Sequence, residues 1–143
     1  MHIHREKFLH YTQEQVFSVI NDIPSYQDYL PWCSKSAVLW KKEHFLEGLL
    51  EIKFGFLRYQ FSTINEVFHH DKIKMKLSSG PFKHLKGEWT IHSKDDQSSV
   101  LIFDIDFEFN SVLLSRTFGV FFEKICQNII DSFEKRLYQL YSL

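Results

Sequence analysis

The sequence is poor in the residues that usually break or cross-link a chain. It has five glycines, three prolines and two cysteines in 143 residues, and a single alanine, Ala37. Cys33 and Cys126 lie far apart, with no CxxC motif and no histidine at the spacing of zinc ligands. We therefore expect neither a disulfide framework nor a structural zinc site. No proline- or glycine-rich stretch divides the chain, which predicts one domain over residues 1–143.

Long apolar runs and targeting signals are also missing. No run approaches the 18 apolar residues of a membrane-spanning helix. The first residues, MHIHRE, have neither the apolar core of a secretory signal nor the acid-poor character of a transit peptide. We expect a cytoplasmic protein. The net charge of −1 gives no overall positive field for nucleic acid, although residues 35–94 contain 11 Lys and Arg against 6 acidic residues.

The familiar catalytic templates are absent as well. There is no GxSxG, HExxH or P-loop motif, and no GxGxxG after a predicted strand. Asp104, Asp106 and Glu108 are two residues apart on one predicted strand, so they share a face, which we interpret as a solvated stripe. The pair His69-His70 supplies at most two metal ligands. The sequence therefore predicts a protein that is not an enzyme and holds no metal.

What the chain has in excess is phenylalanine, 15 residues of it, within an aromatic content of 17%. From about residue 36 to residue 109 apolar and polar residues alternate, as in Leu50, Ile52, Phe54 and Phe56 or in the run 101–109. A period of two predicts an antiparallel sheet with one buried and one solvated face. The rings on the buried face could enclose either a packed core or an apolar cavity.

Helical spacing flanks this region on both sides. Thr12 and Gln15 form a predicted capping box before a helix that ends near Pro24, and a short helical turn follows at 25–29. Over residues 111–141 apolar side chains recur every three to four positions, which predicts one helix about 45 Å long. The order predicts an α+β fold, in which a curved antiparallel sheet of six to seven strands wraps around the long C-terminal helix.

Lys72, Lys74 and Lys76 form a ladder on one face of a predicted strand. Lysine often protects an edge strand from aggregation, and this is one interpretation. The other is a positive stripe for phosphate, either of lipid head groups or of an RNA backbone. Three lysines do not distinguish these alternatives.

Two motifs carry a family resemblance. The segment YQDYLPWC at 26–33 resembles the Y-x-x-[FY]-L-P-W-C segment of the coenzyme Q-binding, polyketide cyclase-like proteins of the START-like superfamily. The segment GPFKHLKGEW at 80–89 resembles the G-P-F-x-x-L-x-G-x-W segment of the same family. The resemblance implies a helix-grip fold with an apolar cavity between sheet and helix. It also implies non-catalytic binding of ubiquinone, or a related isoprenoid lipid, in support of respiration.

The spacing of strands and helix predicts the residues that would line the cavity around such a ligand. Pro31 and Pro81 predict two rigid turns at its rim, with Trp32 and Phe82 facing inward. Polar partners of a quinone head group are harder to choose, and Tyr59 and the region of Cys33 are the candidates. The segments 26–32 and 112–114 would form an apolar mouth, which implies peripheral contact with the inner face of a membrane. The predicted ligand-binding residues are Pro31, Trp32, Phe82, Leu85, Trp89, Phe103, Phe107, Phe118, Phe122 and Ile125.

The same bacterial family includes the ribosome-association toxin, which gives an alternative function. This alternative implies docking to the large ribosomal subunit and a block of subunit joining. A ribosome-binding protein would need its cations on one exposed surface. The residues predicted for this surface are Lys72, Lys74, Lys76, Lys83 and Lys86.

Overall fold

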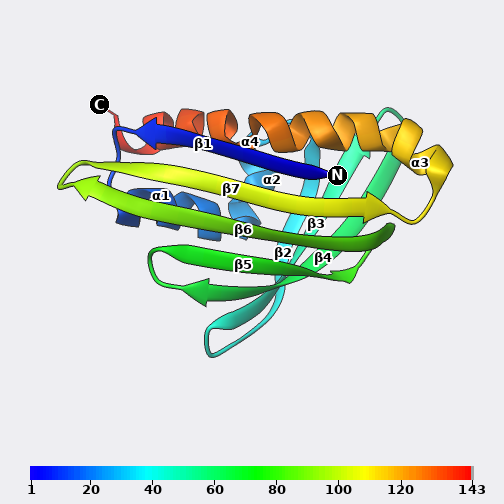
Figure 1. Cartoon of the computed structure of the whole chain (residues 1–143), viewed down its shortest axis with the longest axis horizontal. Coiled ribbons are helices and arrows are strands. Elements are labelled where there is room, and N and C mark those ends of the chain that lie inside the picture. The colour runs from blue at the N-terminus through cyan, green and yellow to red at the C-terminus, as the bar shows by residue number, and fades with distance from the viewer. Residues whose placement is uncertain (143) are drawn as a thin grey trace.

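Seven strands form one antiparallel sheet in the computed structural model, which describes residues 1–142 (Figure 1). The strand order is β1-β7-β6-β5-β4-β3-β2, so each strand from β2 to β7 pairs with the next, and β1 closes the sheet against β7. The strands are β1 (His2–Leu9), β2 (Cys33–Lys42), β3 (Phe45–Phe54), β4 (Leu57–Phe68), β5 (Lys72–Ser79), β6 (Phe82–Asp95) and β7 (Ser98–Phe109).

The helices lie between β1 and β2 and after β7. They are α1 (Gln13–Asn21), the 3-10 helix η1 (Ile23–Ser25), α2 (Tyr26–Tyr29), α3 (Val112–Arg116) and α4 (Phe118–Tyr141). The predicted capping box is present at the start of α1. The Gln15 backbone N–H donates to the Thr12 hydroxyl at 3.1 Å, and the Thr12 N–H donates to the Gln15 side chain at 2.9 Å. The cap satisfies two backbone groups that the first turn leaves unpaired.

The long C-terminal helix predicted over 111–141 is interrupted, and in this respect the prediction is wrong. Thr117 has φ −110° and ψ −90°, which separates α3 from α4. The Thr117 hydroxyl donates to the Leu113 carbonyl at 2.9 Å, a local bond that competes with the regular helix. Just beyond the break, a Cβ at Gly119 would lie 3.1 Å from the Phe109 ring, so the glycine lets α4 approach β7 closely.

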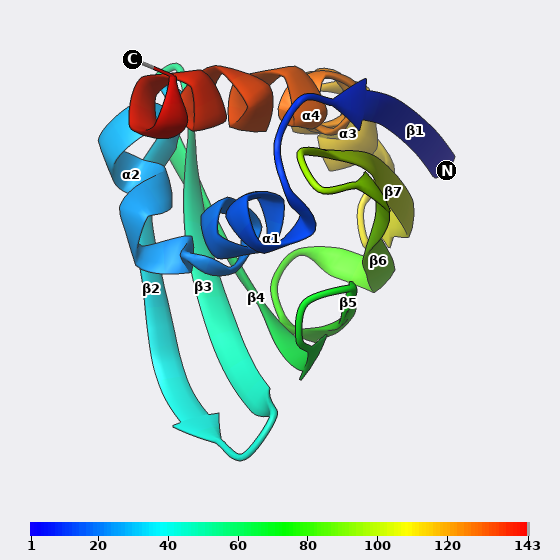
Figure 2. The ribbon, with the colours of Figure 1, turned by 90° about the vertical axis from the view of Figure 1, so that its left-hand side faces the viewer.

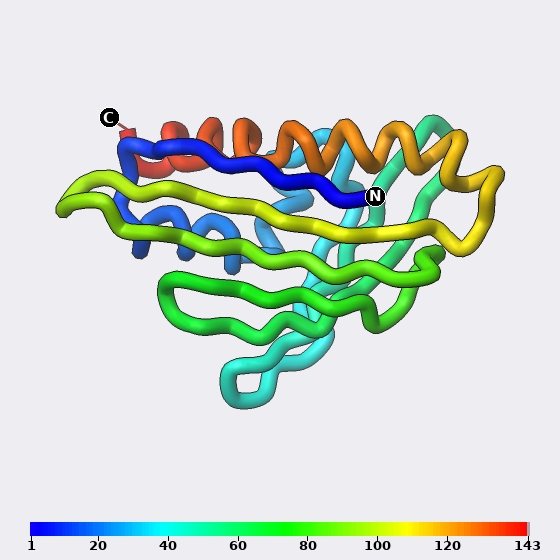
Figure 3. Tube along the Cα trace, in the orientation of Figure 1, coloured from blue at the N-terminus to red at the C-terminus, as the bar shows by residue number. Residues whose placement is uncertain are grey.

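The sheet curves around the helices as the sequence predicted. Figure 2 shows the strands from β2 round to β1 partly enclosing α1, with α4 across the open side. The β2–β3 hairpin extends away from the rest of the molecule, as the trace in Figure 3 shows. This is the expected α+β helix-grip arrangement: a seven-stranded antiparallel sheet wrapped on a long helix.

The position of β5 excludes one interpretation of the lysine ladder. β5 lies between β4 and β6 in the middle of the sheet, and it is hydrogen-bonded on both sides. Protection of an edge strand is therefore not the role of Lys72, Lys74 and Lys76. The strands at the edges are β1 and β2.

The two faces of β7 confirm the predicted alternation. Its inward side chains, from Leu101 to Phe109, are buried, while the carboxylates between them face the solvent side. Asp104 accepts from His4 at 2.6 Å, and Asp106 lies 3.4 Å from His84. The solvated stripe is thus paired with histidines. None of the helices in residues 1–142 combines the length and apolar composition needed to cross a bilayer.

Candidate ligand-binding cavity

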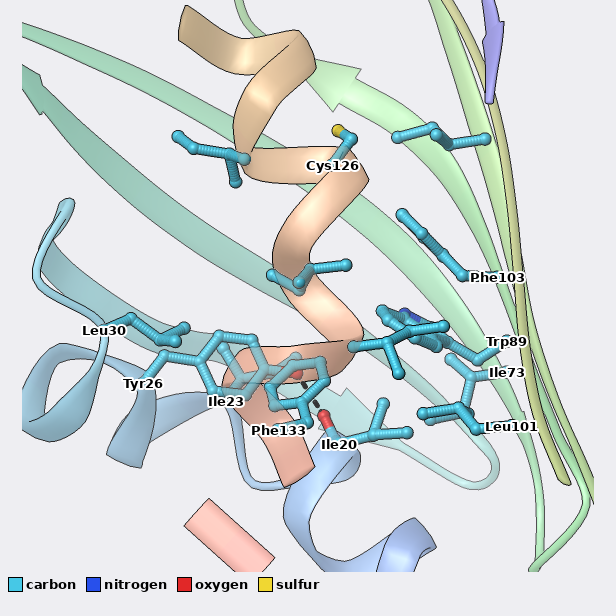
Figure 4. Close-up of a cluster of buried hydrophobic side chains, with 14 of the residues drawn as sticks. Ile20, Ile23, Tyr26, Leu30, Ile73, Trp89, Leu101, Phe103, Cys126 and Phe133 are labelled. Carbon is cyan, nitrogen blue, oxygen red and sulfur yellow. Dashed lines mark hydrogen bonds between the residues drawn. The ribbon is translucent and has the colours of Figure 1, made fainter. Parts of the chain in front are cut away.

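A cavity of about 100 Å³ lies between the sheet, α4 and the N-terminal helices. Figure 4 shows this region, with Trp89 and Phe103 on the strand side and Cys126 and Phe133 on α4. An engineered cavity of about 150 Å³ binds benzene, so this volume suits a group the size of one ring. The main wall residues are Ile20, Ile23, Tyr26, Trp32, Gly48, Leu50, Ile73, Met75, Leu85, Trp89, Phe103, Phe122, Ile125, Cys126, Ile129 and Phe133.

Aromatic packing fixes the strand wall of the cavity. Trp89 on β6 and Phe103 on β7 are cross-strand partners whose rings stack at 4.1 Å. Phe133 of α4 packs on the same indole at 5.4 Å in an edge-on arrangement. Stacked and edge-on arrangements are the ones that aromatic side chains prefer, so the three rings form one packed surface on this side of the cavity.

The helical wall comes close to the sheet at one glycine. A Cβ on Gly48 of β3 would lie 2.8 Å from the Ile23 side chain, so only glycine lets η1 pack here. Tyr26, which is buried, donates its hydroxyl to the carbonyl of Ile20 at the end of α1. This bond links α2 to α1 and satisfies one of the carbonyls that a helix end leaves unpaired.

The wall of the cavity carries no formal charge. Among its residues in the described chain, Tyr26 and Cys126 are the titratable ones. Burial raises the pKa of both groups above their ordinary values, so each keeps its proton at neutral pH. Within residues 1–142 no three His, Cys, Asp or Glu side chains are grouped to hold a metal ion. The wall thus offers apolar surface and neutral hydrogen-bonding groups to a ligand.

Sequence reasoning missed three polar side chains of the cavity wall: the amides of Asn21 and Asn65 and the hydroxyl of Thr63. The two polar candidates chosen from the sequence lie elsewhere. Tyr59 packs its ring on Phe118 at 4.3 Å, and the Cys33 thiol donates to the Lys35 carbonyl at 3.4 Å. Burial raises the pKa of the Cys33 thiol, so it is a neutral packing group. Neither lines the cavity.

The structure brings most of the predicted ligand residues to the cavity. Six of them line it: Trp32, Leu85, Trp89, Phe103, Phe122 and Ile125. Pro31 is exposed at the turn before Trp32 and is not part of the wall. Phe82, Phe107 and Phe118 are buried but lie outside the wall. Contact of any of the ten with a ligand stays a prediction.

The three predicted rings outside the wall, Phe82, Phe107 and Phe118, pack with Phe109 and Phe122 in a group of five rings that we call the ring cluster. Phe82 stacks on Phe109 at 4.6 Å, and the edge of Phe122 meets Phe107 at 4.9 Å. Phe118 lies 5.8 Å from Phe109. These are the stacked and edge-on distances of close aromatic packing. The cluster fills the space beneath the start of α4, with Phe122 shared between it and the cavity.

The five predicted lysines lie on β5 and β6, where acidic residues partly neutralise them. Lys72 binds Glu88 at 3.2 Å, and the Lys83 ammonium is 3.7 Å from Glu108. Lys76 and Lys86 are exposed directly opposite each other on paired strands. Two like charges at this spacing repel, and Asp106 of β7 stands opposite Lys86 on its other side.

A second surface feature lies at the end of the molecule where α3 begins, and we call it the apolar tip: Phe56, Leu57, Val112 and Leu113. In the view of Figures 1 and 3 the β3–β4 turn and α3 lie at this end, and Figure 2 shows that they stand apart from each other across it. Phe56 is fully exposed, and Val112 and Leu113 are 71% and 74% exposed. The nearby Lys53, Arg58 and Arg116 are exposed too.

Comparison with known proteins identifies relatives over nearly the whole chain. Over 140 residues the chain is 32% identical to the ribosome association toxin RatA of Pseudomonas aeruginosa, covering 98% of this chain and 97% of that protein. It is 29% identical to RatA of Escherichia coli K12, with coverage of 98% and 89%. The mitochondrial coenzyme Q-binding protein COQ10 homolog B of Xenopus laevis is 27% identical over 94% of this chain and 57% of its own length.

Solved structures show the same fold at lower identity. The protein TTHA0849 of Thermus thermophilus has a TM-score of 0.83 at 12% identity, covering 99% of this chain and all of its own. The Zhui aromatase/cyclase of Streptomyces sp. R1128 has a TM-score of 0.82 at 13% identity, covering 99% and 96%. The family model for polyketide cyclase / dehydrase and lipid transport proteins matches residues 9–134. This match covers most of the chain, and the sheet wrapped on α4 agrees with it. The chain therefore belongs to the polyketide cyclase / dehydrase and lipid transport family.

Proposed function

We propose that this protein associates with the ribosome, on the large subunit, and blocks subunit joining without catalysing a reaction. The observation that carries the proposal is its end-to-end similarity to two proteins named ribosome association toxin, at 32% and 29% identity. Both alignments cover 98% of the chain, so the similarity extends over sheet and helices alike. The uncharged cavity wall, which offers no ionised acid or base, supports a role without catalysis.

The ribosome is an anionic partner, and the surface we assign to it is centred on Lys76 and Lys86. Their ammonium groups make no ion pair within the described residues, whereas Lys72 and Lys83 are already paired with carboxylates. Lys74 is exposed on the same face of β5. Phosphate contacts of this kind release counterions, so binding should weaken steeply as salt rises.

Co-sedimentation with purified large subunits, at low and high salt, tests this function. We expect pelleting at low salt that is lost at high salt. The variant Lys76→Glu/Lys86→Glu should abolish it, because two repelling carboxylates replace two phosphate contacts. As a matched control, Lys124→Glu/Lys135→Glu makes the same charge change at exposed positions of α4 and should pellet like the unmodified protein. Absence of pelleting at low salt would remove this proposal.

A second candidate function rests on the cavity: binding of a ring-bearing apolar ligand such as the head group of ubiquinone. Its wall is almost entirely apolar, and its volume of about 100 Å³ is of ring size. The relative named coenzyme Q-binding protein supports a quinone as this ligand. An isoprenoid tail is larger than this volume and would leave beside Trp32 and Leu50, which are half-buried members of the wall.

A lipid ligand enters from a membrane, and we assign this peripheral contact to the apolar tip. Exposed apolar side chains gain by leaving water, and Lys53, Arg58 and Arg116 beside them would face anionic head groups. Segments 52–59 and 109–122 contain no Asp or Glu to oppose this contact. Flotation with vesicles of anionic lipid should recover the protein, and Phe56→Asp/Leu113→Asp should abolish recovery.

Organic extraction of the purified protein, followed by mass spectrometry, tests the ligand. Expression in a quinone-rich host should yield a bound quinone, and the apo protein should take up decylubiquinone. Phe122→Glu places a charge in the wall and should abolish uptake, whereas the surface variant Glu123→Gln should not. Recovery of no lipid together with no uptake of decylubiquinone would overturn this second candidate.

A further inference from the structure

The hydrogen-bonding groups of the cavity wall are few and mostly unused. Trp89 and Asn65 line the cavity and are 5% and 4% exposed. Neither the indole Nε1 of Trp89 nor the amide Nδ2 of Asn65 donates a hydrogen bond to any atom of residues 1–142. The Oδ1 of Asn21 is buried and likewise has no partner among these residues. Buried polar groups are normally satisfied, so Asn21 Oδ1 indicates a missing partner, and the two N–H groups on the same cavity wall are available to it.

The register of the sheet places the two donors on opposite parts of one wall. Trp89 of β6 pairs with Ile73 of β5, while Asn65 of β4 pairs with Met75 of β5. The two residues therefore stand two strand spacings apart on either side of β5 and are offset by two residues along it, which separates them by roughly 12 Å. All four of these side chains line the cavity. Figure 4 shows the Trp89 indole projecting from the sheet toward α4 and into this space.

The surroundings of Asn65 orient its amide. The Thr63 hydroxyl donates to Asn65 Oδ1 at 2.7 Å, which leaves the amide nitrogen directed elsewhere. That nitrogen would lie 3.9 Å from a Cβ at Gly48, where the sheet meets η1. Asn21 lies at the end of α1, two residues before the Ile23 side chain that packs on the same glycine. The unpaired side-chain oxygen Oδ1 of Asn21 and the amide nitrogen Nδ2 of Asn65 thus lie on the same side of the cavity.

We propose that the cavity selects ring-bearing ligands that carry a carbonyl or hydroxyl oxygen, bound by the N–H groups of Trp89 and Asn65. A carbonyl oxygen accepts from either of these donors, and a hydroxyl can also donate to Asn21 Oδ1. A purely apolar ring of the same size leaves all three groups unpaired, which disfavours it. This inference rests on the second candidate function and specifies the chemistry of its ligand.

Two probes of nearly identical shape test the selection: phenol and toluene differ by a hydroxyl in place of a methyl group. Titrations followed by NMR chemical shifts should show that the unmodified protein prefers phenol. Asn65→Leu removes the amide at similar size and should reduce the preference about tenfold. Trp89→Phe keeps a ring and removes the N–H, with the same direction expected. Asn128→Leu, at an exposed position of α4, should leave the preference unchanged.

Decylubiquinone separates failure of this inference from failure of the ligand function. If it binds the unmodified protein and Asn65→Leu equally well, the cavity is a ligand site and the selection is overturned. A preference for toluene in the unmodified protein also overturns it. If phenol, toluene and decylubiquinone all fail to bind, both proposals fall. Thermal unfolding of each variant establishes that any loss of binding occurs in folded protein.

Discussion

The two halves of the interface between the sheet and α4 are packed in opposite ways. Under the start of α4 the side chains of the ring cluster pack against one another, with ring centroids 4.6 to 6.3 Å apart. Toward the N-terminal helices the walls change to aliphatic side chains around Trp89 and Phe103, and about 100 Å³ stays empty. The five rings of the cluster come from β6, β7 and α4, which are directly adjacent. The cavity wall also includes residues of α1 and η1, which pack on the sheet at the other end of the interface.

The same excess of phenylalanine thus forms a closely packed group at one end of the interface and borders a cavity at the other. Stability should therefore depend mainly on the ring cluster, and ligand binding mainly on the cavity. Four substitutions or conditions test this division, because each affects one half or neither.

The largest effect is expected from Phe118→Ala in the ring cluster. Phe118 is 1% exposed and contacts Tyr59, Phe109 and Phe122. Loss of a buried ring costs about 3–5 kcal/mol, because transfer energy is lost and a void is left. Urea unfolding would measure the change. The control Phe56→Ala, at a fully exposed ring, should change stability by less than about 0.5 kcal/mol. A loss below about 1 kcal/mol for Phe118→Ala would contradict the division.

A smaller effect is expected from Tyr26→Phe at the cavity end. The substitution removes the hydroxyl that donates to the Ile20 carbonyl and leaves this acceptor without its partner. The expected cost is about 1–2 kcal/mol, since a buried polar group loses its hydrogen bond. Urea unfolding again gives the value, with Tyr138→Phe at an exposed position of α4 as control. Equal stability of Tyr26→Phe and the unmodified protein would show that this bond does not hold α2 to α1.

Cys126→Leu should have the opposite sign, because it fills the void from the side of α4. Cavity-filling substitutions commonly add about 0.5–2 kcal/mol of stability. The same change should abolish uptake of decylubiquinone. Cys126→Ser, which keeps the size of the side chain, serves as control and should leave the volume open. If Cys126→Leu is less stable and still binds the probe, the empty volume is not where the structure places it.

The smallest effect on stability is expected from pH. It should come from a surface residue, outside both the ring cluster and the cavity. Hydrogen bonds to Asp104 and Glu6 raise the pKa of His4 above its ordinary 6.5, and this residue is on the outer face of β1. A raised pKa means that protonated His4 stabilises the folded state below about pH 6.5. This contribution is lost as the pH rises through the folded-state pKa. Stability should fall slightly from about pH 6 to about pH 8, and His4→Gln should remove that fall. An unchanged slope in His4→Gln would assign the dependence to another group.

Much of the fold followed from the sequence because alternation and helical spacing report which side of an element is buried. The two faces of β7 and the capping box at Thr12 are examples. The break at Thr117 did not follow, because the apolar spacing continues through it. The central place of β5 did not follow either, since strand order depends on pairing that single strands do not encode.

The cavity was predictable as a feature, but only part of its wall was. Phe103 and Phe107 both face inward on β7, yet one lines the cavity and the other fills the ring cluster. The alternation of apolar residues shows on which side of the strand a residue lies. It does not show whether that residue meets the cavity or the ring cluster. Asn65 was missed because the segment STINE at 62–66 is polar on both sides of β4. Nothing local indicates that its inward residues would be an asparagine and a threonine.

The pairing of β1 with β7 has a consequence for how the protein folds. Every other strand pairs with its neighbour in the sequence, but residue 2 pairs with residue 106. Contacts between distant residues form late, because chain entropy is lost before they give stability. During synthesis β1 has no partner until β7 has left the ribosome. Substitutions in β1, such as Ile3→Ala, should therefore accelerate unfolding and leave the folding rate nearly unchanged.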